Sequence, residues 1–141
     1  MNNLSEHHCD HSQNEALHDC YILGIISDTM MEHKAEIIVQ CYSCKARFKV
    51  ILDGIFSMCV HDFWEGNIID DMSQYEWPNM PAEWLADVLH TNDTKDLIGK
   101  LAPDLDRIRD QKMILLHITP SYGCEIFALC KSIMVQELAD D

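Results

Sequence analysis

Glycine, proline and long apolar runs are all scarce in this chain. Its 141 residues include only 5 glycines and 4 prolines. A glycine-rich phosphate-binding loop and a dinucleotide-binding fingerprint are both absent, as are a Gly-x-Ser-x-Gly nucleophile elbow and a His-Glu-x-x-His metal helix. No stretch of about 18 consecutive apolar residues occurs, so we expect no membrane span. The chain therefore carries none of the common catalytic signatures.

Basic residues are also few, and the acidic excess is uneven. The chain holds 24 Asp and Glu against 10 Lys and Arg, a formal charge of −14. Residues 1–20 contain no Lys or Arg, and residues 60–110 contain twelve acidic and four basic residues, a local balance of −8. A surface of this charge repels nucleic acid and anionic lipid and attracts basic proteins and cations. We therefore expect neither nucleic acid nor a membrane as the partner.

The start of the chain lacks the basic and apolar regions of a secretory signal, so we expect a cytoplasmic protein whose seven cysteines are reduced. An apolar fraction of 48% suits a packed globule. We interpret residues 1–18 as a polar arm rich in His and Cys, and residues 19–141 as a single domain.

The order of the predicted elements indicates the fold class. Strand-like segments occur at residues 20–26, 36–42, 45–52, 55–61, 68–75, 113–119 and 124–138. Helical spacing of apolar residues occurs within about residues 81–110, with a break expected before Pro103. This order predicts an α+β fold, an antiparallel sheet of about five to seven strands with one or two helices packed on one face. For residues 124–138 a helix is the alternative.

A turn at Asp53-Gly54 is predicted to join residues 45–52 and 55–61 in a β-hairpin. A loop with Gly54 in the left-handed conformation places the apolar residues of both segments on one face. In that register Cys59 and His61 lie on the polar face, with His61 opposite Lys45.

Aromatic and acidic residues alternate between residues 62 and 87, and all three tryptophans lie there. Trp often anchors protein interfaces, and acidic side chains speed the approach of a basic partner. The sequence thus predicts a site for a basic protein partner. Its predicted residues are Asp62, Trp64, Glu65, Asp70, Asp71, Trp77, Glu83 and Asp87. The alternative is that the tryptophans are core residues and the acids are solvated.

Two groups of residues could bind zinc, nickel or copper. The first is His7, His8, Cys9 and His11; the second is Cys41 and Cys44, for which Cys59 and His61 could complete a zinc site. The alternatives are a polar arm without metal and cysteines without function. No other cofactor is indicated.

A small hydrolase or transferase remains a third hypothesis. It would need a pocket in which His61 or His117 lies beside a carboxylate.

Residues Gly54-Ile55 followed by 63–69 (Phe-Trp-Glu-Gly-Asn-Ile-Ile) resemble a strand-turn-strand pattern of small uncharacterised bacterial domains. In size, acidity and sheet-plus-helix layout, the whole chain is similar to immunity proteins that neutralise basic bacterial toxins. The resemblance implies a non-enzymatic binding protein. It assigns no individual residue, and the His- and Cys-rich arm departs from it.

Overall fold

Eight antiparallel strands form one sheet in the part of the chain that the structure, a computed structural model, describes: residues 17–28, 30–64 and 66–139. The strands are β1 (Tyr21–Asp28), β2 (Lys34–Gln40), β3 (Arg47–Asp53), β4 (Ser57–His61), β5 (Ile68–Glu76), β6 (Ile114–Tyr122), β7 (Glu125–Cys130) and β8 (Ser132–Glu137). Between β5 and β6 lie the helices α1 (Ala82–Val88) and α2 (Ala102–Asp110) and the 3-10 helix η3 (Thr94–Leu97). The α+β class is confirmed, but the predicted number of about five to seven strands is too low.

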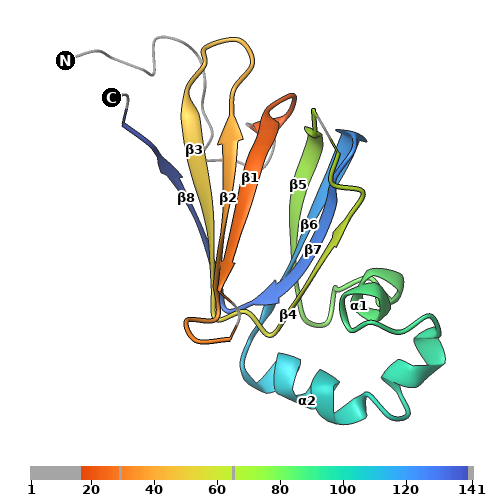
Figure 1. The fold of residues 1–141 in the computed structure, drawn as a ribbon. Helices are drawn as coiled ribbons and strands as arrows, with labels where there is room; N and C mark the ends of the chain where they lie inside the picture. The colour runs from red at the N-terminus through yellow and green to blue at the C-terminus, as the bar shows by residue number, and fades with distance from the viewer. Residues whose placement is uncertain (1–16, 29, 65, 140–141) are drawn as a thin grey trace.

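The sheet folds back on itself along a bent two-stranded ribbon. The strand order is β4-β7-β6-β5-β1-β2-β3-β8. β3 continues into β4 and β7 continues into β8, while β3 pairs with β8 and β4 pairs with β7. Figure 1 shows the result: β8, β3, β2 and β1 form one half, and β5, β6, β7 and β4 form the other. The two halves diverge from the corner of the ribbon.

That corner lies where the hairpin was predicted. Gly54 has the predicted left-handed conformation, with φ of 67°. However, the Asp53 carbonyl accepts a hydrogen bond from the Lys131 N–H at 2.9 Å, and β4 leaves β3 to pair with β7. A Cβ atom on Gly54 would lie 2.8 Å from Cγ of Lys131. The predicted pairing of residues 45–52 with 55–61 is therefore wrong, because β3 pairs with β2 and β8, and β4 pairs with β7.

The main core lies between the two halves. The side chains of Val50 and Leu52 on β3, Leu116 and Ile118 on β6, and Ile126 on β7 are all 0% exposed. Alternation of buried and exposed residues along β3 confirms the strand pattern predicted for residues 45–52. One face of each half is thus covered by the other half.

Helix α1 covers the outer face of the second half. Leu85 and Val88 of α1 pack with Leu115, Phe127 and Leu129 in a second apolar cluster. β6 and β7 are consequently buried on both faces, which explains the continuous apolar run at residues 126–130. The region 124–138 is neither one long strand nor a helix, because β7 and β8 are separate strands on either side of exposed Lys131.

The two helices do not both pack on one face, so that part of the fold prediction is wrong. α1 packs against β4 and β7, whereas α2 contacts η3 and lies beyond the end of the sheet (Figure 1). The predicted break is confirmed, since η3 ends at Leu97 and Pro103 lies in the first turn of α2. Proline suits that position because its missing N–H has no partner in the first turn. After α1 the chain runs through η3 and α2, beyond the end of the sheet, before it returns to the sheet in β6.

Candidate functional site

A hollow on the outer face of the second half-sheet gathers three carboxylates. It has a volume of about 390 Å³. Glu83 and Asp87 come from α1, and Glu125 comes from the start of β7. The rings of Trp84 and Phe127 supply most of its aromatic surface, and no Lys or Arg lines it. We name it the acidic hollow.

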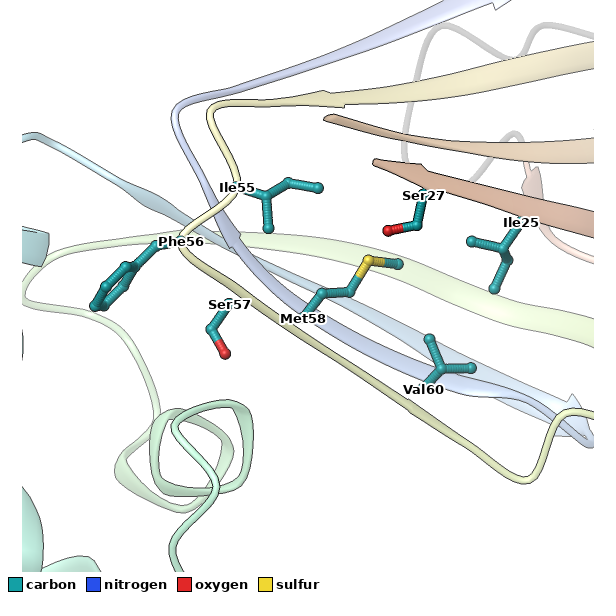
Figure 2. A pocket seen from close by; sticks show the side chains of 7 residues that line it. All are labelled: Ile25, Ser27, Ile55, Phe56, Ser57, Met58 and Val60. Carbon is teal, nitrogen blue, oxygen red and sulfur yellow. The ribbon is translucent and has the colours of Figure 1, made fainter. Parts of the chain in front are cut away.

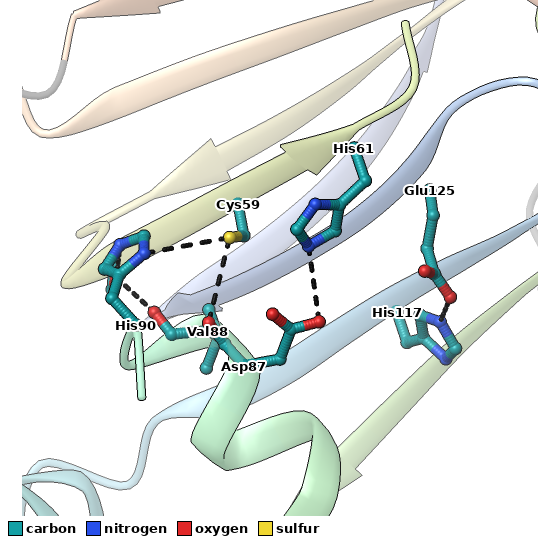
Figure 3. A network of polar contacts seen from close by, with 8 residues as sticks. Cys59, His61, Asp87, Val88, His90, His117 and Glu125 are labelled. Atoms are coloured by element: carbon teal, nitrogen blue, oxygen red, sulfur yellow. Dashed lines mark hydrogen bonds and ion pairs between the residues drawn. The ribbon is translucent and has the colours of Figure 1, made fainter. Parts of the chain in front are cut away.

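Stacked rings position Glu125 in the acidic hollow. The His117 ring lies parallel to the Phe127 ring at 4.3 Å between centroids, and the Trp84 ring lies 4.1 Å from His117. His117 is buried, and its Nε2 lies 2.8 Å from Oε2 of Glu125 (Figure 3). Since a carboxylate oxygen accepts, Nε2–H donates, and among the described residues Nδ1 has no hydrogen-bond partner. The ring proton that forms this bond therefore lies on Nε2.

Exposed aromatic side chains lie at the end of the same half-sheet, where β4 connects to β5 and β6 connects to β7. Phe63, Trp64 and Tyr122 are 49%, 57% and 50% exposed. The Trp64 and Tyr122 rings meet edge to face, with centroids 5.9 Å apart. We name these three residues the aromatic end. Large exposed rings of this kind are typical of residues that become buried on binding.

The side chain of Asn67 fixes the loop that carries Trp64. Its side chain is buried, accepts a hydrogen bond from the Trp64 N–H at 2.8 Å and donates one to the Trp64 carbonyl. A Cβ atom on Gly123, which has φ of 83°, would lie 2.5 Å from Oδ1 of Asn67. The turn between β6 and β7 therefore packs directly against the loop that carries Trp64.

The predicted partner-binding residues fall into two neighbouring groups and one outlier. Asp62 directly follows β4, and Asp70 and Asp71 lie near the start of β5, so these acids lie at the same end of the half-sheet as Trp64. Glu83 and Asp87 lie in the acidic hollow. Trp77 follows the far end of the nine-residue β5, about 30 Å from its start. Glu65 lies outside the described residues.

His18 is a titratable base that lies among the acids at this end. The His18 Nδ1–H donates to the Asp70 carbonyl at 2.6 Å, and Nε2 lies 3.4 Å from a carboxylate oxygen of Asp19. The hydrogen bond to Asp70, followed by the charge of Asp19, raises the pKa of His18 above its usual value. This contact ties the segment before β1 to β5.

The predicted metal sites are not assembled in the described residues. His7, His8, Cys9 and His11 lie outside them. Cys44 is disulfide-bonded, so it offers no thiolate and is not reduced as expected. Cys59 and His61 pair across to β7 and not to the turn after β2, which places them on the other half of the sheet from Cys41.

A second hollow, of about 320 Å³, lies between β1 and β4. Figure 2 shows its lining, which includes Ile25, Ser27, Met58 and Val60. No titratable side chain lines it. It therefore suggests no chemistry.

Two residues of these surfaces, Glu125 and Tyr122, were missed from the sequence, as was His90, which lies beside Ser57 and Cys59. Glu125 and Tyr122 belong to a strand pair that meets β4 and β5 only in the folded sheet. The spacing of Asp87 and His90, three residues apart at the end of a helix, was a local signal that could have been used.

No protein-family model matches the chain, and a search of curated proteins gives no match. Among the described residues, no helix has both the length and the apolar character that crossing a bilayer requires. Function is therefore argued from the site itself.

Proposed function

We propose that this protein is a non-enzymatic binding protein that captures a basic protein partner, with neutralisation of a toxin, as in immunity proteins, as the concrete form. One observation carries the proposal: the acidic hollow and the aromatic end lie on the same half-sheet, with Tyr122 of the aromatic end only three residues before Glu125 of the hollow. The segments that build them, residues 54–94 and 113–130, contain no Lys or Arg. The surface therefore offers carboxylates and exposed rings with no Lys or Arg from these segments among them.

The chemistry of the acidic hollow favours a Lys or Arg side chain of the partner. The Glu83 and Glu125 carboxylates would pair with its charge, and the face of Trp84 offers a cation–π contact. Trp64 and Tyr122 would then bury their exposed rings against apolar surface beside it. Acidic residues around the site would steer the partner during approach. Affinity and association rate should therefore depend on different residues.

The experiment is a binding measurement against ionic strength. Protein from the source cells is captured on the immobilised chain and identified, and its binding kinetics are then measured by surface plasmon resonance. Between 0.05 and 0.5 M salt the association rate constant should fall by about ten-fold or more. An association rate that is indifferent to salt, or a captured partner without a basic surface, would contradict the proposal.

Matched variants separate contact with the partner from steering of its approach. Trp64→Ala and Glu83→Gln should raise the dissociation rate, whereas Asp70→Asn, outside the acidic hollow and exposed near the start of β5, should mainly slow association. Trp77→Ala, at the far end of β5, and Glu137→Gln, exposed on β8, are the controls. If the controls weaken binding as much as the test variants do, the partner binds elsewhere.

A further inference from the structure

We propose that Cys59, His61, Asp87 and His90 form a zinc site that fastens the end of α1 to the edge strand β4. Cys59 and His61 are two residues apart on β4, so both side chains point to the outer face of the sheet. Asp87 lies on the last turn of α1, and His90 follows that helix. The site goes beyond the proposed binding function and does not depend on it.

The ligand atoms already lie close together. One ligand atom from each of Cys59, His61 and Asp87 lies within 4.8 Å of the other two. Nε2 of His61 is 3.3 Å from Oδ2 of Asp87, and Nδ1 of His90 is 3.8 Å from Sγ of Cys59 (Figure 3). A tetrahedral zinc ion with bonds of about 2.0–2.3 Å needs ligand atoms roughly 3.4–3.8 Å apart. His90 lies outside this group of three, so its ring would have to move towards His61 and Asp87 to become the fourth ligand.

Ser57 fixes the tautomer of His90. Its hydroxyl donates its one hydrogen to the Val88 carbonyl at 2.6 Å, and its oxygen lies 3.3 Å from Nε2 of His90. With its hydrogen used, the hydroxyl accepts from Nε2–H, which leaves the lone pair of His90 on Nδ1. That lone pair is on the nitrogen nearer to Cys59. A polar neighbour that sets the protonated nitrogen in this way is typical of metal-bound histidines.

The backbone of His90 is costly for a histidine. Its φ is 62°, and its N–H and that of Thr91 bond to carbonyls in the last turn of α1. Helices that end in this way usually place Gly or Asn at such a position, because a Cβ atom is strained there. A side chain kept in a strained conformation beside Cys59, itself one of the three clustered ligands, indicates a function for that side chain.

The side chain of His61 gives a further observation, which does not depend on His90. Its Nε2 atom is buried and makes no hydrogen bond to any described residue, although Asp87 lies within ion-pair distance. A buried ring nitrogen without a hydrogen bond is unfavourable unless it has another partner. Zinc would also balance the charge, because one thiolate and one carboxylate neutralise a divalent cation. Four protein ligands make a closed, structural site with no open position for substrate.

The test is zinc binding by the full chain, purified without a tag and stripped of metal. Zinc is titrated in competition with a chromophoric chelator, and cobalt is used as a spectroscopic probe. The proposal expects a tight site, a sulfur-to-cobalt charge-transfer band and tetrahedral visible bands. It also expects zinc to raise the unfolding temperature, since a metal that binds only the folded state stabilises it. Absence of a tight site overturns the proposal.

The variant His90→Gly tests whether the His90 side chain itself binds the zinc. Glycine relieves the backbone strain, so the metal-free variant should unfold at the same or a higher temperature than the metal-free wild type. Its zinc affinity should nevertheless fall at least about ten-fold. His33→Gly is the matched control, since His33 is exposed and also has a positive φ, of 54°, but lies in the turn between β1 and β2.

Cys59→Ser should remove the charge-transfer band, and Ser57→Ala should weaken zinc binding without removing a ligand. Tight zinc binding that is unchanged in both His90→Gly and Cys59→Ser would overturn the proposal, because the metal would then lie elsewhere in the chain. None of these measurements needs the protein partner, so failure here and failure of the proposed function are distinguishable.

Discussion

Replacing glycine by alanine at three positions separates backbone strain from steric conflict at the aromatic end. A Cβ atom on Gly24, in β1, meets nothing within 4 Å, and this residue has no positive φ. Gly66 has φ of 79° but also has open space around it. Gly123 combines φ of 83° with an approach of 2.5 Å to Oδ1 of Asn67. Gly24→Ala therefore has neither cost, Gly66→Ala adds the backbone strain, and Gly123→Ala adds the steric conflict to that strain.

The expected changes in the free energy of unfolding follow from these environments. Gly24→Ala should be neutral or stabilising by up to about 1 kcal/mol, because alanine restricts the unfolded chain. Gly66→Ala should cost about 1–2 kcal/mol for the left-handed conformation alone. Gly123→Ala should cost about 2–5 kcal/mol, since displacing buried Asn67 adds about 1–3 kcal/mol of lost hydrogen bonding.

Urea unfolding followed by circular dichroism and by tryptophan fluorescence measures these differences. If Gly123→Ala is no less stable than Gly66→Ala, Asn67 does not pack against the turn as described. Gly123→Ala should also weaken partner binding even where the variant is folded, because the loop that holds Trp64 would shift. Gly24→Ala is the control for both measurements.

Two further predictions concern titratable groups. The hydrogen bond to the Asp70 carbonyl raises the pKa of His18 in the folded state, so its stabilising effect is full below about pH 6.5 and is lost as the pH rises through the raised value. The difference in stability between wild type and His18→Gln should thus shrink between pH 5.5 and pH 8.5, and a difference that is constant with pH would refute this. Burial acts to raise the pKa of Cys41, but hydrogen bonding, chiefly to Ser43, outweighs it, so that this pKa is lowered. Burial raises the pKa of Cys130 to about 12. Alkylation at pH 8, mapped by mass spectrometry, should therefore modify Cys41 before Cys130, and faster modification of Cys130 would contradict the structure.

Local patterns identified most strands but not their partners. The alternation at residues 45–52 predicted β3, because one of its faces is buried and the other is not. The Asp53-Gly54 pair is a strong hairpin signal, yet here it marks a corner at which β3 meets Lys131. Which strand pairs with which depended on contacts far apart in the sequence, and turn residues alone do not encode them.

For the candidate site, too, local features of the sequence were informative, whereas contacts between distant segments could not be predicted. Composition predicted an acidic surface with exposed rings, and the exposed Trp64 and the two carboxylates of α1 are consistent with it. Trp77 was assigned to the same site because it is near in sequence, but β5 carries it to the opposite end. Glu125 was missed because its approach to α1 arises only when β7 pairs with β4. Metal ligands were sought in Cys-x-x-Cys spacing, whereas the closest cluster joins a strand to a helix end.

The bent ribbon has a consequence for how the chain reaches its native state. Each of its two strands runs through both halves of the sheet, so neither half can be completed without the other. β4 must find β7 after the whole helical region has been made, and β3 must find β8 later still. Such distant pairings slow folding toward the range of about milliseconds to seconds. The molecule should thus assemble late and all at once, with no stable half-formed product.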